Sequence, residues 1–528
     1  MVGEIVKRNT TVVVNKEKSV SLTDMRQVAV ELFSICWTSW KYRLWVETKS
    51  AWRKGRMFGN RRFNIREEDM SESNCNIEKQ LLYGKDIQQE KFWSQENSAK
   101  DKIFFQAGDG SQGFGMTDEL LSKHLLLLGG IGSGKTNVIN FIIDSLQKKM
   151  TDDDVMIIFD SKGDYKEKFF DSKNQKHVLI AHDVGYKKIS KSWNIFGELK
   201  NDNGEYDEET SPIIAKEISK QLFVGRESSH QPFFTLAASD IVAKVLIYML
   251  RQKQQNEELT TSDFVEFVRS ATAVTYFKKL REYDDLKNVT TYLGIGKDAS
   301  DHVVVSNQGV GVIAEINSMV NDMFTGAFEK TYENGNVSMR ELVREKKGRT
   351  VFVEYDLEVG SLLGPIYRIL FDLVLKEALG GRKKKRGNTY LIIDEASLLP
   401  NLVHLQDALN FGRSLGVKVI AGLQSISQLY DSYGKEKGKV IAAGFMNSFC
   451  FHTWDLESRQ FISDRFGANY SSLSFYHNGQ SEPIVFQREG HVVEDWDVLN
   501  LEVGQAVINL TMDRPIRFKF KFRKFEEK

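Results

Sequence analysis

The chain has 528 residues, 41% hydrophobic and 27% charged, which is typical of a globular protein with several domains. Its 72 basic and 72 acidic residues cancel, so contacts with nucleic acid must come from local clusters of charge. The three cysteines are too scattered for a disulfide framework or a zinc site. We find no signal peptide and no apolar run near the 18 residues of a spanning helix, and therefore expect a cytoplasmic protein without a transmembrane segment.

Residues 21–55 begin with good helix-capping residues and continue with helix-compatible ones, which predicts a helix. Half of the eight tryptophans lie here: Trp37, Trp40, Trp45 and Trp52. The helix either packs on the body through its aromatic side, or lies at a membrane interface or on a membrane-bound partner. Residues 59–100 are polar and lack periodicity, so they are expected to form a linker or a surface arm.

From residue 124 onward, short apolar runs alternate with helical patterns. The runs occupy residues 124–129, 155–160, 177–182, 350–355, 390–394, 417–423 and 448–453. Continuous apolar strands separated by helices indicate an α/β core, with a mostly parallel sheet covered by helices on both faces. Residues 211–345 instead show helical patterns, which predicts an inserted all-α domain. Short β-like pieces after residue 470 are expected to extend the sheet edge.

This organisation predicts four segments. They are an N-terminal helical region with a polar linker at 1–100, the first part of a nucleotide-binding domain at 101–210, the all-α insertion at 211–345, and the second part with C-terminal β segments at 346–528.

The strongest motif follows the first apolar run and opens a helix, as a phosphate-binding P-loop (Walker A) must. It comprises Gly129, Gly130, Ile131, Gly132, Ser133, Gly134, Lys135 and Thr136. The glycines let backbone N–H groups and the helix N-terminus surround a phosphate. Lys135 is expected to bridge the β- and γ-phosphates of ATP, and Thr136 to bind Mg²⁺. The core is therefore interpreted as a RecA-like P-loop NTPase.

A second run, Tyr390–Ile393, delivers the carboxylates Asp394 and Glu395 at its carboxyl end, beside the phosphate loop of a parallel sheet. This is a Walker B pattern, in which Asp394 holds the Mg²⁺ shell and Glu395 orients the attacking water. Asp160 ends another apolar run and is a rival for the role of Asp394, but it lacks the second carboxylate.

Arg413 lies near the end of the helix that follows, and Gln424 ends the next strand. In ring-shaped motors, an arginine reaches into the nucleotide site of the neighbouring subunit and a strand-end glutamine senses the γ-phosphate. Spacing alone leaves Arg413 open between this role and a surface salt bridge.

These motifs, in this order, resemble those of the type IV coupling proteins, the TraG/TraD-like ATPases of conjugation in the wider HerA/FtsK superfamily. The resemblance runs from about 120 to 470. Besides the P-loop it rests on IIFDSKGDY at 157–165, on WNIFGEL at 193–199 and on the segment from Leu391 to Gly434. Asp160, Lys162 and Gly163 lie in the first of these stretches, and the sequence assigns them no chemistry.

The resemblance implies a hexamer that hydrolyses ATP at subunit interfaces and pumps DNA through a central channel. It places Arg413 on the arginine-finger position and Gln424 on the sensor position. Family members usually carry N-terminal transmembrane helices, and we expect none here. Either a partner in the membrane anchors the chain through the tryptophan-rich helix, at the inner face of the cell membrane, or the protein moves DNA for another purpose.

Three functions remain open at this point. The first is a translocase for single-stranded DNA with its relaxase, acting on a type IV secretion channel. The second is a HerA-like translocase for double-stranded DNA in repair or phage defence, and the third is an ATP-gated protein scaffold.

Two basic segments are candidates for DNA contacts, Arg382–Arg386 and Arg514–Lys524. In the second, we expect Phe518, Phe520 and Phe522 to share one face of an edge strand, because successive side chains of a strand alternate.

Overall fold

The computed structural model describes residues 76–87, 101–108, 110, 113–226, 232–253, 258–298, 302–380, 387–476, 482–510 and 514–526. The chain divides into two compact units: residues 88–461 with 495–528, and residues 1–87 with 462–494. The tryptophan-rich segment 21–55 and the basic run Arg382–Arg386 lie outside the described residues.

A nine-stranded sheet is the centre of the larger unit, in the order β18-β17-β14-β4-β13-β12-β5-β11-β6. All seven apolar runs predicted from the sequence are strands of it, and they pair in parallel. They are β4 (Leu125–Leu128), β5 (Val155–Asp160), β6 (His177–Ile180), β11 (Arg349–Glu354), β12 (Thr389–Ile393), β13 (Val417–Leu423) and β14 (Asn447–Phe451). The predicted α/β class with a mostly parallel sheet is confirmed.

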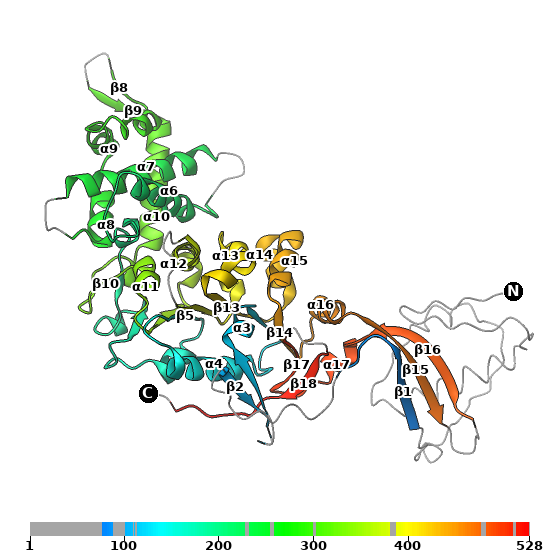
Figure 1. The fold of residues 1–528 in the computed structure, drawn as a ribbon. Coiled ribbons are helices and arrows are strands. Elements are labelled where there is room, and N and C mark those ends of the chain that lie inside the picture. Colours follow the sequence, from blue (N-terminus) through cyan, green and yellow to red (C-terminus); the bar gives the residue numbers. More distant parts are fainter. Residues whose placement is uncertain are drawn as a thin grey trace, which may run out of the picture. The chain divides into compact units, whose positions relative to one another are not determined.

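Helices cover both faces of this sheet (Figure 1). One face packs on α4 (Lys135–Lys149), α5 (Asp164–Phe169) and the hairpin of β2 (Asp101–Gln106) and β3 (Gly113–Thr117). The other face packs on α12 (Gly360–Gly380), α13 (Leu405–Phe411) and α14 (Ile426–Tyr433). The unit also contains α3 (Asp118–Leu121), α15 (Lys435–Gly444), α17 (Asp495–Leu499) and the 3₁₀ turns η2 (Val184–Tyr186), η6 (Ala396–Leu398) and η7 (Gly412–Leu415).

Two antiparallel strands extend the sheet beyond β14, as the sequence predicted. They are β17 (Gln505–Leu510) and the edge strand β18 (Ile516–Lys519). Phe518 and Phe520 are buried and pack on Phe105 and Phe114 of the β2–β3 hairpin. Phe522, expected on the same face, is instead 78% exposed, because β18 ends at Lys519 and the last β bridge beyond it is that of Phe520 with Ala107.

Helices dominate the chain between β6 and β11, the part of the chain that includes the proposed insertion. They are α6 (Thr210–Leu222), α7 (Phe233–Gln252), α8 (Thr261–Ser270), α9 (Ala273–Leu280), α10 (Asn307–Met323) and α11 (Met339–Glu345), with η3 (Gly197–Leu199), η4 (Lys287–Leu293), η5 (Gly326–Phe328) and the small hairpin β8 (Ile295–Lys297) with β9 (Val303–Val305). Among the described helices, α7 alone is long and apolar enough to cross a membrane, which corrects the statement that no such run exists. Its apolar window is 67% buried, against neighbours that include α6 and α10.

The insertion leaves and rejoins the sheet through two short parallel strands, β7 (Ser192–Trp193) and β10 (Asn336–Val337). Glu198, in the WNIFGEL stretch, is fully buried between them. Its carboxylate accepts hydrogen bonds from the Trp193 indole (2.9 Å), the Ser338 hydroxyl (2.9 Å) and the first N–H of α11, at Met339 (2.7 Å). One buried side chain therefore joins the outgoing and returning segments.

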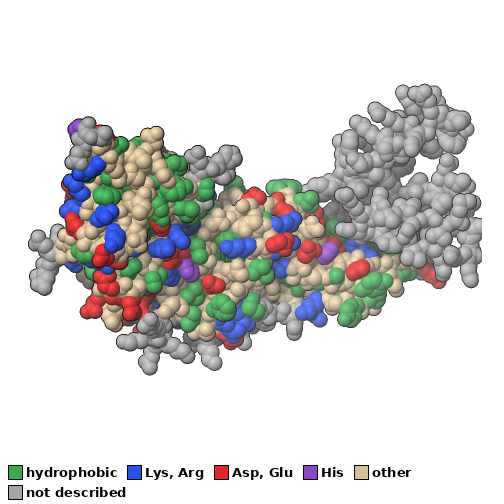
Figure 2. Space-filling view, turned by 90° about the horizontal axis from the view of Figure 1, so that it is seen from above, with side chains coloured by type: hydrophobic (Ala, Val, Ile, Leu, Met, Phe, Trp, Pro, Cys, Tyr) green, Lys and Arg blue, Asp and Glu red, His purple; other side chains and the backbone are tan. Residues whose placement is uncertain are grey.

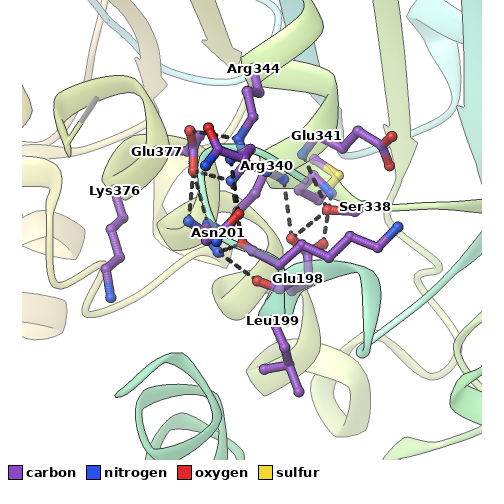
Figure 3. Close-up of polar contacts among 12 residues, drawn as sticks. Glu198, Leu199, Asn201, Ser338, Arg340, Glu341, Arg344, Lys376 and Glu377 are labelled. Carbon is purple, nitrogen blue, oxygen red and sulfur yellow. Dashed lines mark hydrogen bonds and ion pairs between the residues drawn. The ribbon is translucent and has the colours of Figure 1, made fainter. Parts of the chain in front are cut away.

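Arg340 continues this network into the core (Figure 3). Its guanidinium donates to the carbonyl oxygen of Glu198 (2.6 Å) and to the carboxylate of Glu377 on α12 (2.9 Å). Arg344 donates to Glu377 as well, at 2.9 Å. Charge-assisted bonds of this kind are strong where water is excluded. The network thus fixes the root of the insertion on the helix that packs across the sheet.

The smaller unit contains a three-stranded antiparallel sheet of β1 (Asn76–Tyr83), β15 (Ala468–Tyr476) and β16 (Ile484–His491), and α16 (Leu456–Phe466) leads into it. β1 falls within residues 59–100, for which the sequence predicted a linker. β15 and β16 were expected to extend the main sheet and do not. The linker interpretation is wrong for β1 because its partner, β15, follows almost the whole larger unit in sequence.

Substitution Glu198→Ala is expected to destabilise the larger unit by on the order of 3–5 kcal/mol, because several buried donors lose their charged acceptor together. Thermal unfolding by calorimetry measures the change. Glu205→Ala, in an exposed loop nearby, is the matched control. Equal shifts of the two variants would contradict a structural role for Glu198.

Candidate functional site

The glycine-rich loop lies between β4 and α4, at the carboxyl edge of the parallel strands. Gly134 has φ of 113°, and a Cβ on it would lie 2.8 Å from the Cα of Gly504. Only glycine fits there. The Ser133 hydroxyl is buried and has no hydrogen-bond partner among the described residues. A buried donor without an acceptor, beside the N-terminus of a helix, suits an anion.

Lys135 is the first residue of α4, and its side chain turns back over the loop. Its ammonium donates to the carbonyl oxygens of Gly129 and, at 3.2 Å, Gly130. Burial lowers the pKa of Lys135, while the nearby carboxylates of Glu395 and Asp394 oppose that shift. The predicted cation and the predicted acid pair are therefore close neighbours in the fold.

Asp394 directly follows β12 and is held by two hydroxyl groups. Its carboxylate accepts from Ser161 at 2.5 Å and from Tyr165 at 2.7 Å. Tyr165 is fully buried, and burial, together with the charge of Asp394, keeps its pKa well above the ordinary value. The phenol therefore stays protonated and donates. Tyr165 also has a side-chain hydrogen bond with Thr136, so it joins the loop to the acid.

Asp160, the rival carboxylate, has a different position. It is fully buried, and its side chain accepts the N–H groups of Tyr165 (3.0 Å) and Lys166 (2.8 Å) at the start of α5. Burial raises the pKa of Asp160 to about 7. The Asp-Ser-Lys-Gly stretch, to which the sequence assigned no chemistry, is thus a turn that orients Ser161 and Tyr165 toward Asp394.

Glu395 lies beside Asp394 and is only 8% exposed. Its carboxylate accepts from the Ser397 hydroxyl at 2.8 Å and from the side chain of Gln424, which follows β13. Burial raises the pKa of the Glu395 carboxyl, which favours a group able to take up a proton. Because β13 lies between β4 and β12, Gln424 stands between the glycine-rich loop and the acid pair.

One cavity of about 1460 Å³ brings these groups together. Its lining includes Gly130, Gly132, Ser133, Gly134, Lys135, Thr136, Asp394, Glu395 and Gln424. Thr136 and Asp394, which share Tyr165 as a partner, present hydroxyl and carboxylate oxygens, the ligands that Mg²⁺ prefers. The residues present therefore fit both a phosphate chain and a hard divalent cation.

Comparison with known families gives a match over residues 112–473 to the type IV secretion-system coupling protein DNA-binding domain. The chain belongs to this family. A search of curated proteins finds no match.

Solved structures of conjugative coupling proteins share the fold of this coupling protein. The trigonal form of bacterial TrwBdeltaN70 in complex with sulphate has 19% identity and a TM-score of 0.63, over 85% of this chain and 96% of that one. Plasmid coupling protein TrwB in complex with ADP and Mg²⁺ has 20% identity and a TM-score of 0.60, over 82% and 91%. The RecA-like P-loop NTPase fold predicted from the sequence is confirmed.

Arg413 of this coupling-protein chain does not line the cavity. It lies in η7, and its side chain is 57% exposed, with Glu119 at 3.5 Å as a weak partner. An exposed pair of this kind contributes little to stability. The guanidinium is therefore accessible to another molecule and lies outside the cavity of the glycine-rich loop.

The sequence missed one wall of the cavity. Its lining residues are Ala107, Gly108, Val503, Gly504, Gln505, Arg517, Phe518, Lys519, Phe520 and Phe522. These residues belong to the β2–β3 region and to the C-terminal strands. No motif marks Ala107, Gly108 or Val503–Gln505, and the segment Arg514–Lys524 was considered only as a DNA contact and an edge strand. The wall meets the glycine-rich loop only through the order of strands in the sheet.

A second group of metal-type ligands lies outside the cavity, where Glu217, Asp372 and His404 place ligand atoms within 4.8 Å of one another. Lys376 pairs with Glu217, and buried Asp372 accepts from the backbone and the ring of His404. These internal partners already balance the charges. The group is therefore best explained as a tie between α6 of the insertion and α12 and α13 of the core.

Proposed function

We propose that this coupling-family protein is an ATP-driven motor that moves DNA, preferentially single-stranded, with an attached relaxase toward a type IV secretion channel. The observation that supports it most is the shared cavity of the glycine-rich loop and the acid pair. The working form is a homo-oligomer, a hexameric ring with ATP bound at subunit interfaces.

The triphosphate lies on the loop residues Gly129 to Thr136. The buried Ser133 hydroxyl and the first N–H groups of α4 donate to phosphate oxygens. Lys135 exchanges the loop carbonyls for the β- and γ-phosphates, and the nearby carboxylates oppose the lowering of its pKa by burial.

Thr136 and Asp394 hold Mg²⁺, which neutralises charge on the phosphates when it is bound. Ser161 and Tyr165 each donate a hydrogen bond to Asp394 and so fix the direction of its carboxylate. Because the carboxylate is already aligned, the reaction requires no reorganisation free energy to orient it.

Glu395 orients the attacking water and takes up its proton, which its raised pKa favours. Gln424 donates to Glu395 and stands between the acid pair and the phosphate loop. It is therefore placed to sense the γ-phosphate, because loss of that group removes a partner from the same cavity.

Arg413 acts on the nucleotide of the neighbouring subunit in the ring. Its exposure, its weak partner and its position outside the cavity of its own subunit support this role. A guanidinium is suited to stabilise the charge of the transferring phosphoryl group.

The DNA contacts come from local features, because the net charge is zero. On the face that Figure 2 shows, basic and acidic side chains of the described residues are interspersed. In the candidate segment Arg514–Lys524, Arg517 pairs with Asp497 and Arg523 with Asp144, both at 2.9 Å. These ion pairs argue against that segment as the main DNA contact and leave Arg382–Arg386 as the stronger candidate.

We extend the proposal to the place of action, the cytoplasm at the inner face of the cell membrane. A membrane protein of the secretion channel would recruit the chain through the tryptophan-rich segment 21–55, which lies outside the described residues.

Substitution Glu395→Gln is expected to lower the Mg²⁺-dependent ATPase rate by roughly 10²–10⁴-fold while nucleotide binding persists, since an amide cannot take up the proton. Lys135→Ala lowers both the rate and the affinity. Phosphate release and calorimetric titration measure the two effects. Glu436→Gln on α15, whose side chain is 86% exposed, is the control. If Glu395→Gln and Lys135→Ala both left the ATPase rate unchanged, the proposal that this site hydrolyses ATP would be rejected.

Substitution Arg413→Ala is expected to abolish most hydrolysis, by about 10³-fold or more, and to leave nucleotide affinity largely unchanged. When this variant is mixed into wild-type rings, the ATPase rate falls more than in proportion to its share. Arg281→Ala, another exposed arginine, is the control and should have no such effect. A strictly linear decrease would contradict sites shared between subunits.

ATPase activity is expected to rise with single-stranded DNA more than with double-stranded DNA, and the stimulation should weaken with salt because phosphate contacts release counterions. Steady-state ATP hydrolysis with matched oligonucleotides measures it. Preference for the duplex would instead indicate a HerA-like translocase, and stimulation by neither would favour an ATP-gated scaffold.

A further inference from the structure

The order of strands divides the cavity into two sides. Beside β4, the strands β13, β12 and β5 carry Gln424, the acid pair and Ser161. On the opposite side of β4, the sheet continues through β14, β17 and β18. In the proposed function the γ-phosphate points to the acid side, so the rest of the nucleotide must extend toward the C-terminal strands.

The wall on that side is fixed to the glycine-rich loop. Gly504 donates its N–H to the Ser133 carbonyl at 2.9 Å, and Phe520 donates its N–H to the Gly504 carbonyl at 2.8 Å. The amide of Asn137, in the first turn of α4, donates to the Lys521 carbonyl at 3.0 Å. Backbone hydrogen bonds therefore hold the C-terminal segment against the loop, and the Asn137 side chain holds it against the start of α4.

Further along, the segment is held on the body of α4. The Phe525 ring packs edge-on against Phe141 of α4, with ring centroids 5.9 Å apart, and against Phe169 of α5 at 5.2 Å. Arg523 pairs with Asp144 of α4. Anchors thus lie on both sides of Phe522.

The wall presents apolar surface to the cavity. Phe522 is 78% exposed and Val503 is 75% exposed, although both line the cavity. The polar side chains beside them have partners, since Arg517 pairs with Asp497 and Lys519 with Glu502. Exposed apolar side chains at the rim of a polar site mark a place where an apolar group of the ligand binds.

We propose that this wall, formed by Val503–Gln505 and Lys519–Phe522, is the nucleobase subsite, in which the purine of the bound nucleotide stacks on the Phe522 ring. The inference rests on the proposed function, because it assumes a nucleotide whose phosphates lie on the glycine-rich loop. The cavity of about 1460 Å³ is larger than a triphosphate alone requires, and an aromatic ring binds the face of any purine. The C-terminal segment would then be a part of the ATP site rather than a DNA contact.

The test compares two ligands that share a phosphate chain, a non-hydrolysable ATP analogue and inorganic tripolyphosphate, each titrated with Mg²⁺ in a calorimeter. Phe522→Ala is expected to weaken the ATP analogue by roughly tenfold or more, which is the usual effect of one lost stacking contact, and to leave tripolyphosphate unchanged. Phe522→Tyr keeps the aromatic ring and should bind the analogue as the wild type does. Phe411→Ala, which removes a ring that is 64% exposed on α13 away from the cavity lining, is the matched control.

Equal weakening of both ligands by Phe522→Ala would overturn the subsite and indicate a general distortion of the loop. An unchanged affinity for the ATP analogue would overturn it as well. If the wild-type protein bound neither ligand, the proposed function itself would fail, and that result is distinguishable from a failure of the subsite alone.

Discussion

The site depends on one electrostatic interaction, between a buried lysine and two carboxylates that come from a distant part of the chain. Burial disfavours the charged form of Lys135 and lowers its pKa, and the charges of Glu395 and Asp394 oppose that shift. The same proximity puts Lys135 and the acid pair within one cavity. The parallel sheet makes this possible, because β4 and β12 both end at the same edge with only β13 between them.

Hydrogen bonds to Asp394 explain why the second-strand motif is built as it is. The Asp160 carboxylate accepts hydrogen bonds from the first turn of α5, and the hydroxyl groups of Ser161 and Tyr165 donate to Asp394. The motif therefore acts through a neighbouring strand. A turn that looks purely structural in sequence orients the carboxylate of Asp394, which belongs to another segment.

The sequence was sufficient for features that are local. Each apolar run became a strand, and the glycine-rich loop and the acid pair lie where a parallel sheet requires. It was insufficient where pairing is remote, since β1 joins β15 across nearly the whole chain. The cavity wall at Val503–Gln505 was missed for the same reason, because short polar and apolar residues before an edge strand form no motif. Phe522 was assigned to a strand that ends earlier.

The network of Glu198, Arg340 and Glu377 helps to fix the register in which β11 pairs after the long helical insertion. β11 pairs with β5 and β6, and the whole helical insertion lies between β6 and β11 in sequence. Closing so long a loop costs little more than closing a shorter one, since the entropy grows only with the logarithm of its length. A one-residue slip of β11 would nevertheless reverse its faces. Glu198 joins the segments that leave and re-enter the sheet, and Arg340 joins them to α12. These bonds hold the insertion in a fixed position on the sheet and so support the pairing of β11 in its observed register.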